Sequence, residues 1–242
     1  MLRTRSRLIA VPLAAAALTL TGAGFHAVAA DSSASGAPST ASAPCLADAT
    51  TLVGDLDGDG NPDRISNPGH TGTKMTIQWG TADGTFGKKV SVNDLLGAED
   101  GEIATAAVAD FKNDGTLGMV VSIVEPASGD DANTSRLSEY RPAPLDRSDL
   151  GSAGAVHSDV GDGGEVQELR IAQYNDDAYP DLAILNNPGD GQMDREVRLS
   201  KTDGGLADRD KAANDEFGEW GSRADPPAMP ADGWGQFYES CS

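Results

Sequence analysis

Positive charge is scarce in this sequence of 242 residues, where 18 lysines and arginines face 38 aspartates and glutamates and give a formal net charge of -20. Nucleic acids and anionic membrane surfaces bind proteins through basic patches, so this charge argues against both and favours cations as partners. Long apolar runs are also scarce. After the first 30 residues no segment is apolar enough to cross a bilayer, so we expect no membrane insertion.

The first 44 residues differ from the rest of the chain. The opening stretch has three arginines, no acidic residue, a mostly apolar run over residues 8–20 and small residues just before position 31. This arrangement predicts a cleavable secretory signal at 1–30 and therefore a secreted, extracellular protein. Residues 31–44 are almost all Ser, Ala, Thr, Gly and Pro, a composition that predicts a disordered linker.

Cysteine and histidine are few. In an exported chain the two cysteines, Cys45 and Cys241, are expected to form one disulfide that joins its two ends. Beyond the signal only His70 and His157 remain, and no G-x-S-x-G, H-E-x-x-H or glycine-rich phosphate-binding motif is present. We therefore expect no catalytic residues and interpret both histidines as solvated loop residues. A secreted hydrolase acting on polysaccharide or ester substrates stays open as the alternative, because carboxylates are abundant enough for an acid/base pair.

Internal repetition is the most informative feature of the sequence. Three pairs of segments are similar in pattern: 101–110 with 164–173, 61–69 with 179–189, and 77–86 with 197–206. In the last pair, alternating apolar and polar residues lead into an Asp-Gly turn, as expected for a strand before a tight loop. The similarities indicate repeated units of sheet rather than helices.

These similarities divide a domain at 45–242 into three units and a tail. The units cover about 46–100, 101–163 and 164–206, and an aromatic tail follows at 207–242. A unit of this length accommodates four short antiparallel strands, so we predict an all-β fold of propeller-like blades. Closed propellers typically have four to eight blades. Either the tail and the first strand complete a fourth blade, or the three units form an open arc, or several chains assemble.

Acidic residues alternate in a loop of the first unit. Asp55, Asp57 and Asp59 are followed by a glycine, Asn61 offers a backbone carbonyl, and Asp63 closes the run. Oxygen ligands at alternate positions are the arrangement that calcium favours, so we predict calcium as the cofactor and a loop that is mobile or misfolded without it. The plain alternative is an acidic surface turn held by side-chain to backbone hydrogen bonds.

The same stretch resembles a known family. The run from Val53 to Ile65, together with the later Asp-Gly-Thr-Phe at 83–86, is similar to the FG-GAP or VCBS-type repeat of integrin alpha-subunit propellers and of many secreted bacterial proteins. The resemblance implies a blade whose loop between its first two strands holds calcium. It places the metal at Asp55, Asp57, Asp59, Asn61 (carbonyl) and Asp63. The loop is not an EF-hand, because Ser66 stands where that motif has its glutamate.

The corresponding loops of the other two units depart from this pattern. In the second loop Lys112 stands at a ligand position, and we expect its ammonium group to pair with Asp110 and Asp114 in place of an ion. The third loop is a weaker second candidate for a metal site. Its five positions hold Gln173, Asn175, Asp177, Tyr179 and Asp181.

Aromatic residues make up only 5% of the sequence, yet five of them lie in the last 26 residues: Phe217, Trp220, Trp234, Phe237 and Tyr238. One interpretation is a stacking platform for a sugar or a partner protein. The other, which we favour, is a tail that covers an exposed sheet edge and is held there by Cys241. The sequence therefore predicts a calcium-binding, non-catalytic repeat module with an unidentified extracellular ligand, a glycan or a protein.

Overall fold

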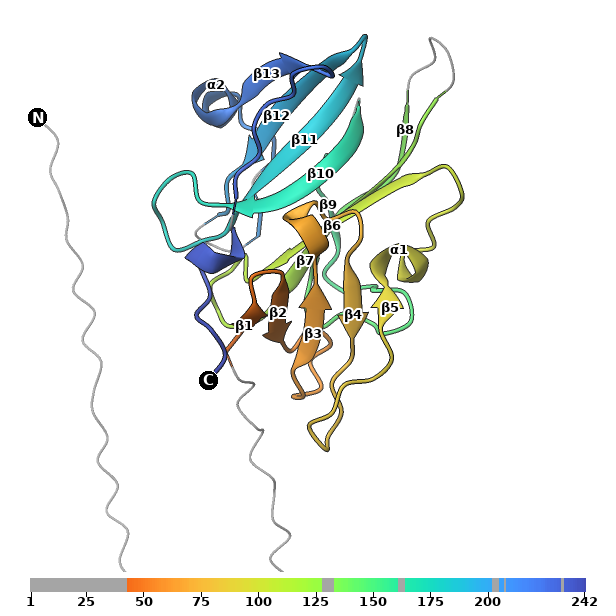
Figure 1. The fold of residues 1–242 in the computed structure, drawn as a ribbon, viewed down its shortest axis with the longest axis vertical. Coiled ribbons are helices and arrows are strands. Elements are labelled where there is room, and N and C mark those ends of the chain that lie inside the picture. Colours follow the sequence, from red (N-terminus) through yellow and green to blue (C-terminus); the bar gives the residue numbers. More distant parts are fainter. Residues whose placement is uncertain (1–42, 128–132, 161–163, 202–204, 207, 232) are drawn as a thin grey trace, which may run out of the picture. The chain divides into compact units, whose positions relative to one another are not determined.

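A computed structural model describes residues 43–242 except 128–132, 161–163, 202–204, 207 and 232. The signal predicted at 1–30 and nearly all of the linker predicted at 31–44 lie outside the described residues. The described chain forms three antiparallel sheets and little helix (Figure 1). The prediction of an all-β fold built from antiparallel blades is confirmed.

The first sheet has five strands, in the order in which they occur along the chain. They are β1 (Cys45–Asp48), β2 (Thr51–Gly54), β3 (Asp63–Ser66), β4 (Thr76–Gln78) and β5 (Val90–Ser91). A short 3-10 helix, η1 (Pro68–His70), follows β3, and α1 (Val92–Leu95) follows β5. Burial alternates along β3, as expected for a strand with one face on the core.

The second and third sheets each have four strands, also in chain order. The second holds β6 (Ile103–Ala109), β7 (Gly118–Glu125), β8 (Thr134–Pro142) and β9 (Val156–His157). The third holds β10 (Glu165–Ala172), β11 (Asp181–Gly189), β12 (Gln192–Arg198) and β13 (Glu219–Ser222), with α2 (Lys211–Phe217) between its last two strands.

The three predicted units correspond to the three sheets, with one correction. The third unit does not end at 206, because its fourth strand is β13, which pairs with β12 from within the predicted tail. The tail also makes a parallel bridge to β1 between Leu46 and Ser240. It therefore extends two existing sheets, and no fourth sheet is present in the part of the chain that the structure describes.

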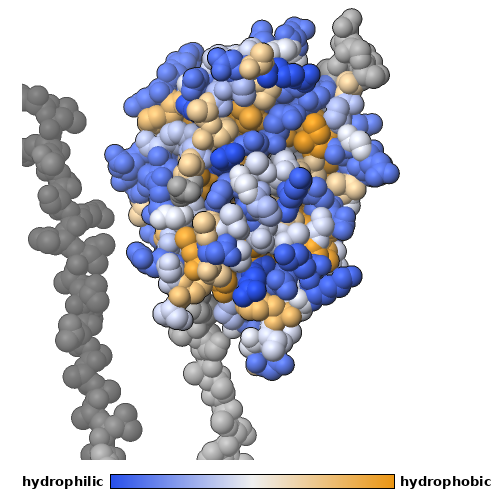
Figure 2. Space-filling model, viewed as in Figure 1, coloured by the Kyte–Doolittle hydropathy of each residue, from blue (hydrophilic) through white to orange (hydrophobic). Residues whose placement is uncertain are grey.

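One hydrophobic core is shared by all three sheets. Leu52 and Ile65 of the first sheet, Val108 of the second and Leu169 of the third belong to the same buried cluster. The strand β6 is rich in alanine and packs against β10, since small side chains let two sheets approach closely. The face of the molecule shown in Figure 2 is mostly hydrophilic, and its hydrophobic residues lie in small separate groups.

The loop after η1 covers the free edges of β6 and β10. The amide of Ala106 donates to the Gly72 carbonyl (3.0 Å), and the amide of Leu169 donates to the Thr71 carbonyl (3.0 Å). A side chain at Gly72 would collide with the Ala106 carbonyl, at 2.3 Å from the Cβ position, and its φ of +78° also favours glycine. The first sheet thereby satisfies edge groups of the other two.

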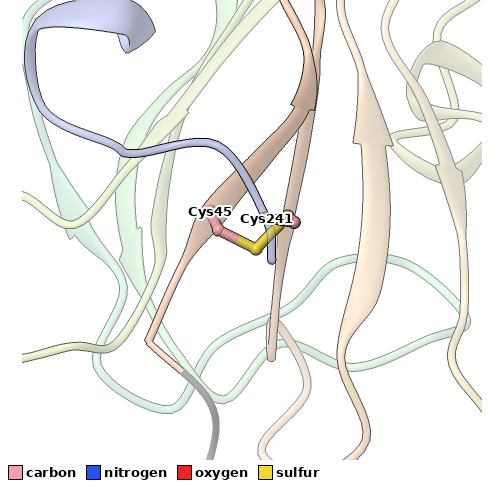
Figure 3. Close-up of a disulfide and its surroundings, with 2 residues drawn as sticks. All are labelled: Cys45 and Cys241. Atoms are coloured by element: carbon pink, nitrogen blue, oxygen red, sulfur yellow. A yellow bond between two sulfur atoms is a disulfide. The ribbon is translucent and has the colours of Figure 1, made fainter.

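The C-terminal tail covers the C-terminal end of the β6 edge, so the favoured interpretation of the tail aromatics is confirmed for two of them. In η2 (Trp234–Gln236), the Trp234 indole donates to the Val108 carbonyl (2.8 Å). The Asp110 amide donates to the Tyr238 hydroxyl (2.6 Å). The predicted disulfide between Cys45 and Cys241 is also present and fixes the end of the tail beside β1 (Figure 3).

Candidate metal centre

The acidic loop of the first blade connects β2 to β3 and is folded around its own carboxylates. Asp55 accepts hydrogen bonds from the amides of Gly58 (2.7 Å) and Gly60 (2.9 Å), one on each oxygen. Both glycines have positive φ, +75° and +84°, a conformation that side chains disfavour. The glycines therefore let a short backbone segment wrap around Asp55.

Three of the five predicted ligands converge in this loop. Carboxylate oxygens of Asp55, Asp57 and Asp63 lie within 4.8 Å of one another. Asp59 is not part of this group, and its Oδ1 accepts from the Asn61 amide (2.8 Å). Among the described residues the group consists of carboxylates alone, which form a donor set for a hard cation such as calcium, so the residues present fit the predicted ion.

Asp63 is fully buried beneath the loop and holds two segments together. Its Oδ2 accepts from the Leu56 amide (2.9 Å) at the start of the loop, and its Oδ1 accepts from the Gly80 amide (2.8 Å) just beyond β4. Burial raises the pKa of Asp63 to about 6, and these two amides partly offset that effect by favouring the carboxylate. Each oxygen keeps a further lone pair for a cation.

An arginine from the second blade also reaches this loop. Arg147 lies in the connector between β8 and β9, and its guanidinium pairs with Asp57 through Nε and with Asp59 through Nη2 (2.5 Å). Asp57 and Asp59 raise the pKa of Arg147 further. The spacing within the acidic loop could not reveal this residue, because it lies 90 positions beyond Asp57.

The loop of the second blade holds no ion pair with Lys112. Asp110 accepts from the amides of Asp114 (3.1 Å) and Gly115 (2.7 Å), and Asp114 accepts from the Thr116 amide (2.9 Å). Lys112 makes no ion pair with any residue that the structure describes, so the predicted pairing with Asp110 and Asp114 is wrong. Backbone amides, and not the ammonium group of Lys112, donate hydrogen bonds to these two carboxylates.

The loop of the third blade is closed by its own amide side chains. The side-chain amide of Asn175 donates to Asp177 Oδ2 (2.8 Å), and the side-chain amide of Gln173 donates to the Asp177 carbonyl. The backbone amide of Tyr179 donates to Asp177 Oδ1 (2.8 Å). Asp181 is buried and repeats the arrangement of Asp63. Its oxygens accept from the amides of Tyr174 (2.9 Å) and Ser200 (2.9 Å), and burial raises its pKa to about 6.

The two histidines lie apart from this centre. His70, predicted to be solvated, is instead half-buried and packs edge-on against Trp234, with ring centroids 6.4 Å apart. His157 is exposed at the end of β9. Neither belongs to the group of three carboxylates.

Residues 55–121 match the family model of the FG-GAP-like repeat. The match runs from the first residue of the acidic loop into β7 and includes Asp55, Asp57, Asp59, Asn61 and Asp63. The chain contains an FG-GAP-type repeat. No curated protein and no solved structure shows significant similarity to the chain.

The FG-GAP repeat therefore contains the three converging carboxylates, whereas the arginine that pairs with two residues of its loop comes from outside the matched segment. Of the helices that the structure describes, none is long and apolar enough to cross a membrane.

Proposed function

We propose that this protein is a secreted repeat module that is stabilised by calcium, binds an extracellular ligand and has no catalytic activity of its own. The observation that carries the calcium part is the convergence of Asp55, Asp57 and Asp63 in a loop already shaped by Gly58 and Gly60. The FG-GAP match over the same residues and the terminal disulfide support an extracellular repeat module. A turnover screen on polysaccharide and ester substrates tests the non-catalytic part.

Calcium should raise the melting temperature of the wild-type protein relative to the same protein in chelator. A calcium concentration 100 times the Kd would stabilise the folded state by about 2.7 kcal/mol. The double substitution Asp57→Asn and Asp59→Asn should abolish this difference. The matched control is the double substitution Asp176→Asn and Asp190→Asn, which removes the same charge from two exposed residues with positive φ that asparagine tolerates. Equal melting temperatures with calcium and with chelator in the wild type would contradict calcium binding.

The ligand surface that we propose is centred on Trp220 in β13. This side chain is 68% exposed, whereas the other tail tryptophan, Trp234, is buried. Phe217 packs against Tyr174, with ring centroids 5.4 Å apart. Trp220 lines a pocket of about 340 Å³ together with Arg209, Lys211, Asn214 and Asp215. An indole face beside polar and charged side chains suits a sugar ring, whose faces stack and whose hydroxyls form hydrogen bonds.

A glycan array should therefore report binding by the wild-type protein and at least about fivefold weaker binding by Trp220→Ala, since truncation of an aromatic anchor residue costs more than about 1 kcal/mol. The melting temperature should not change, because this side chain buries little surface. Val156→Ala is the control, since Val156 is the other large hydrophobic residue that is well exposed in the described part of the chain (55%). Loss of binding in both variants, or no glycan binding by the wild-type protein, would contradict a glycan site at Trp220. A protein partner would then be the ligand to test.

A further inference from the structure

The contact between Arg147 and the acidic loop joins two blades. Arg147 is 42% exposed at its side chain, but Asp57, with which it pairs, is only 6% exposed. Asp57 and Asp59 are alternate residues of the loop, and one guanidinium reaches both. An arginine has a rigid fork of donors and stays charged at any ordinary pH, so it is a permanent cation at this place.

Further contacts hold the guanidinium in position. Its Cζ lies 5.5 Å from the centre of the Trp79 ring, within cation–π range, and Nη2 donates to the Gly80 carbonyl (3.4 Å). The connector itself is fixed to the loop, because the Leu145 amide donates to the Leu56 carbonyl (2.9 Å) and Leu145 is buried. The backbone thus delivers Arg147 to the loop independently of the charges.

We propose that Arg147 is the residue that sets the cation affinity of the acidic loop, because its guanidinium and a bound divalent ion compete for Asp57. The inference rests on the proposed calcium binding. An ion that uses Oδ2 of Asp57 must displace the guanidinium already paired with that oxygen, and the guanidinium also places a positive charge beside the incoming ion. Calcium binding and Arg147 docking are therefore negatively coupled, and the coupling is reciprocal.

The same pairing neutralises part of the negative charge of the acidic loop. Repulsion between close carboxylates is expected to leave such a loop mobile or misfolded without calcium. Asp57 and Asp59 are paired with Arg147, and Asp55 and Asp63 are bonded to backbone amides, so the protein itself offsets part of this repulsion. Arg147 thus acts as a counter-charge for the first loop, the role that the sequence predicts for Lys112 in the second loop.

The test is calcium affinity measured by isothermal titration calorimetry on wild type and Arg147→Met, which removes the charge and keeps an extended side chain. We expect Arg147→Met to bind calcium about tenfold more tightly, within the usual range of coupling between two ligands. In chelator it should melt below the wild type, so its calcium-induced rise in melting temperature should be larger. Arg136→Met is the matched control. Arg136 is similarly exposed (39%) and pairs with Glu102, away from the loop.

Terbium luminescence gives a second readout, because Trp79 lies beside the guanidinium that terbium would displace and can sensitise a bound ion. Tighter calcium or terbium binding by Arg147→Met but not by Arg136→Met supports the proposal. Wild type and Arg147→Met affinities within twofold of each other overturn it and leave calcium binding intact. If neither protein binds calcium or terbium, both this inference and the proposed calcium binding are overturned.

Discussion

Replacing Cys45 and Cys241 with serine should lower the free energy of unfolding by about 4 kcal/mol. The disulfide joins residues 196 positions apart, so it closes almost the whole described chain into a loop. The chain-entropy model gives about 5 kcal/mol for a loop of this length, and removal of native disulfides commonly costs about 2 to 5 kcal/mol. For a domain of this size that loss lowers the melting temperature by roughly 10 °C. Urea denaturation of the oxidised wild type and the double variant measures it.

The non-covalent contacts of the tail provide the control for this prediction. Tyr238→Phe keeps the ring but removes the acceptor of the Asp110 amide, so it should cost about 1 kcal/mol. Reduction of the wild type should reproduce the loss seen in the double serine variant. A smaller loss of unfolding free energy in the double serine variant than in Tyr238→Phe would mean that the disulfide adds little. The tail would then be held by the side chains of Trp234 and Tyr238 and by the backbone hydrogen bonds of Leu46 with Glu239 and Cys241.

Much of the fold could be predicted from the sequence, because the blades repeat the same local chemistry. The similarity of 77–86 to 197–206 corresponds to equivalent backbone contacts. The Thr81 amide donates to the Thr85 carbonyl (3.0 Å), and the Lys201 amide donates to the Gly205 carbonyl (2.7 Å). Such contacts join residues a few positions apart, so their sequence pattern is sufficient to identify them. The position of the acidic loop between two strands could be predicted for the same reason.

The features that sequence reasoning missed depend on contacts between distant segments. Nothing local shows that Glu219–Ser222 pairs with β12, because about 20 residues that include α2 lie between the two strands. Nothing in the acidic loop indicates Arg147, because this residue lies 90 positions beyond Asp57, in the connector between β8 and β9. Lys112 had the right charge and the right local position, but amides had already satisfied its expected partners. Local patterns indicated the three converging carboxylates, whereas tertiary packing determined which cationic side chain lies beside them.

Removing the carboxylate of Asp181 should destabilise the fold by about 3 kcal/mol, whether or not calcium is present. Asp181 is fully buried and joins the start of the third loop, at Tyr174, to the segment after β12, at Ser200. Asp181→Ala leaves two amide donors without their acceptor, and each buried, unsatisfied group costs about 1 to 3 kcal/mol. Relief of the buried charge, which is reflected in the raised pKa, offsets part of this loss. Asp176→Asn in the same loop is the control, since Asp176 is exposed.

The comparison with Asp63→Ala separates the structural role of this position from metal binding. Asp63 accepts the equivalent two hydrogen bonds, from the amides of Leu56 and Gly80. In chelator, Asp63→Ala should therefore lower the free energy of unfolding by as much as Asp181→Ala does. In calcium the two variants should differ, because Asp63→Ala also loses the stabilisation by the ion while Asp181→Ala keeps it. If Asp63→Ala and Asp181→Ala lose equal unfolding free energy in calcium and in chelator, the buried aspartate only stabilises the fold of its blade and does not bind the ion. The second blade, which has Gly118 at this position, folds without such a carboxylate, so the residue is a local support rather than a requirement of every sheet.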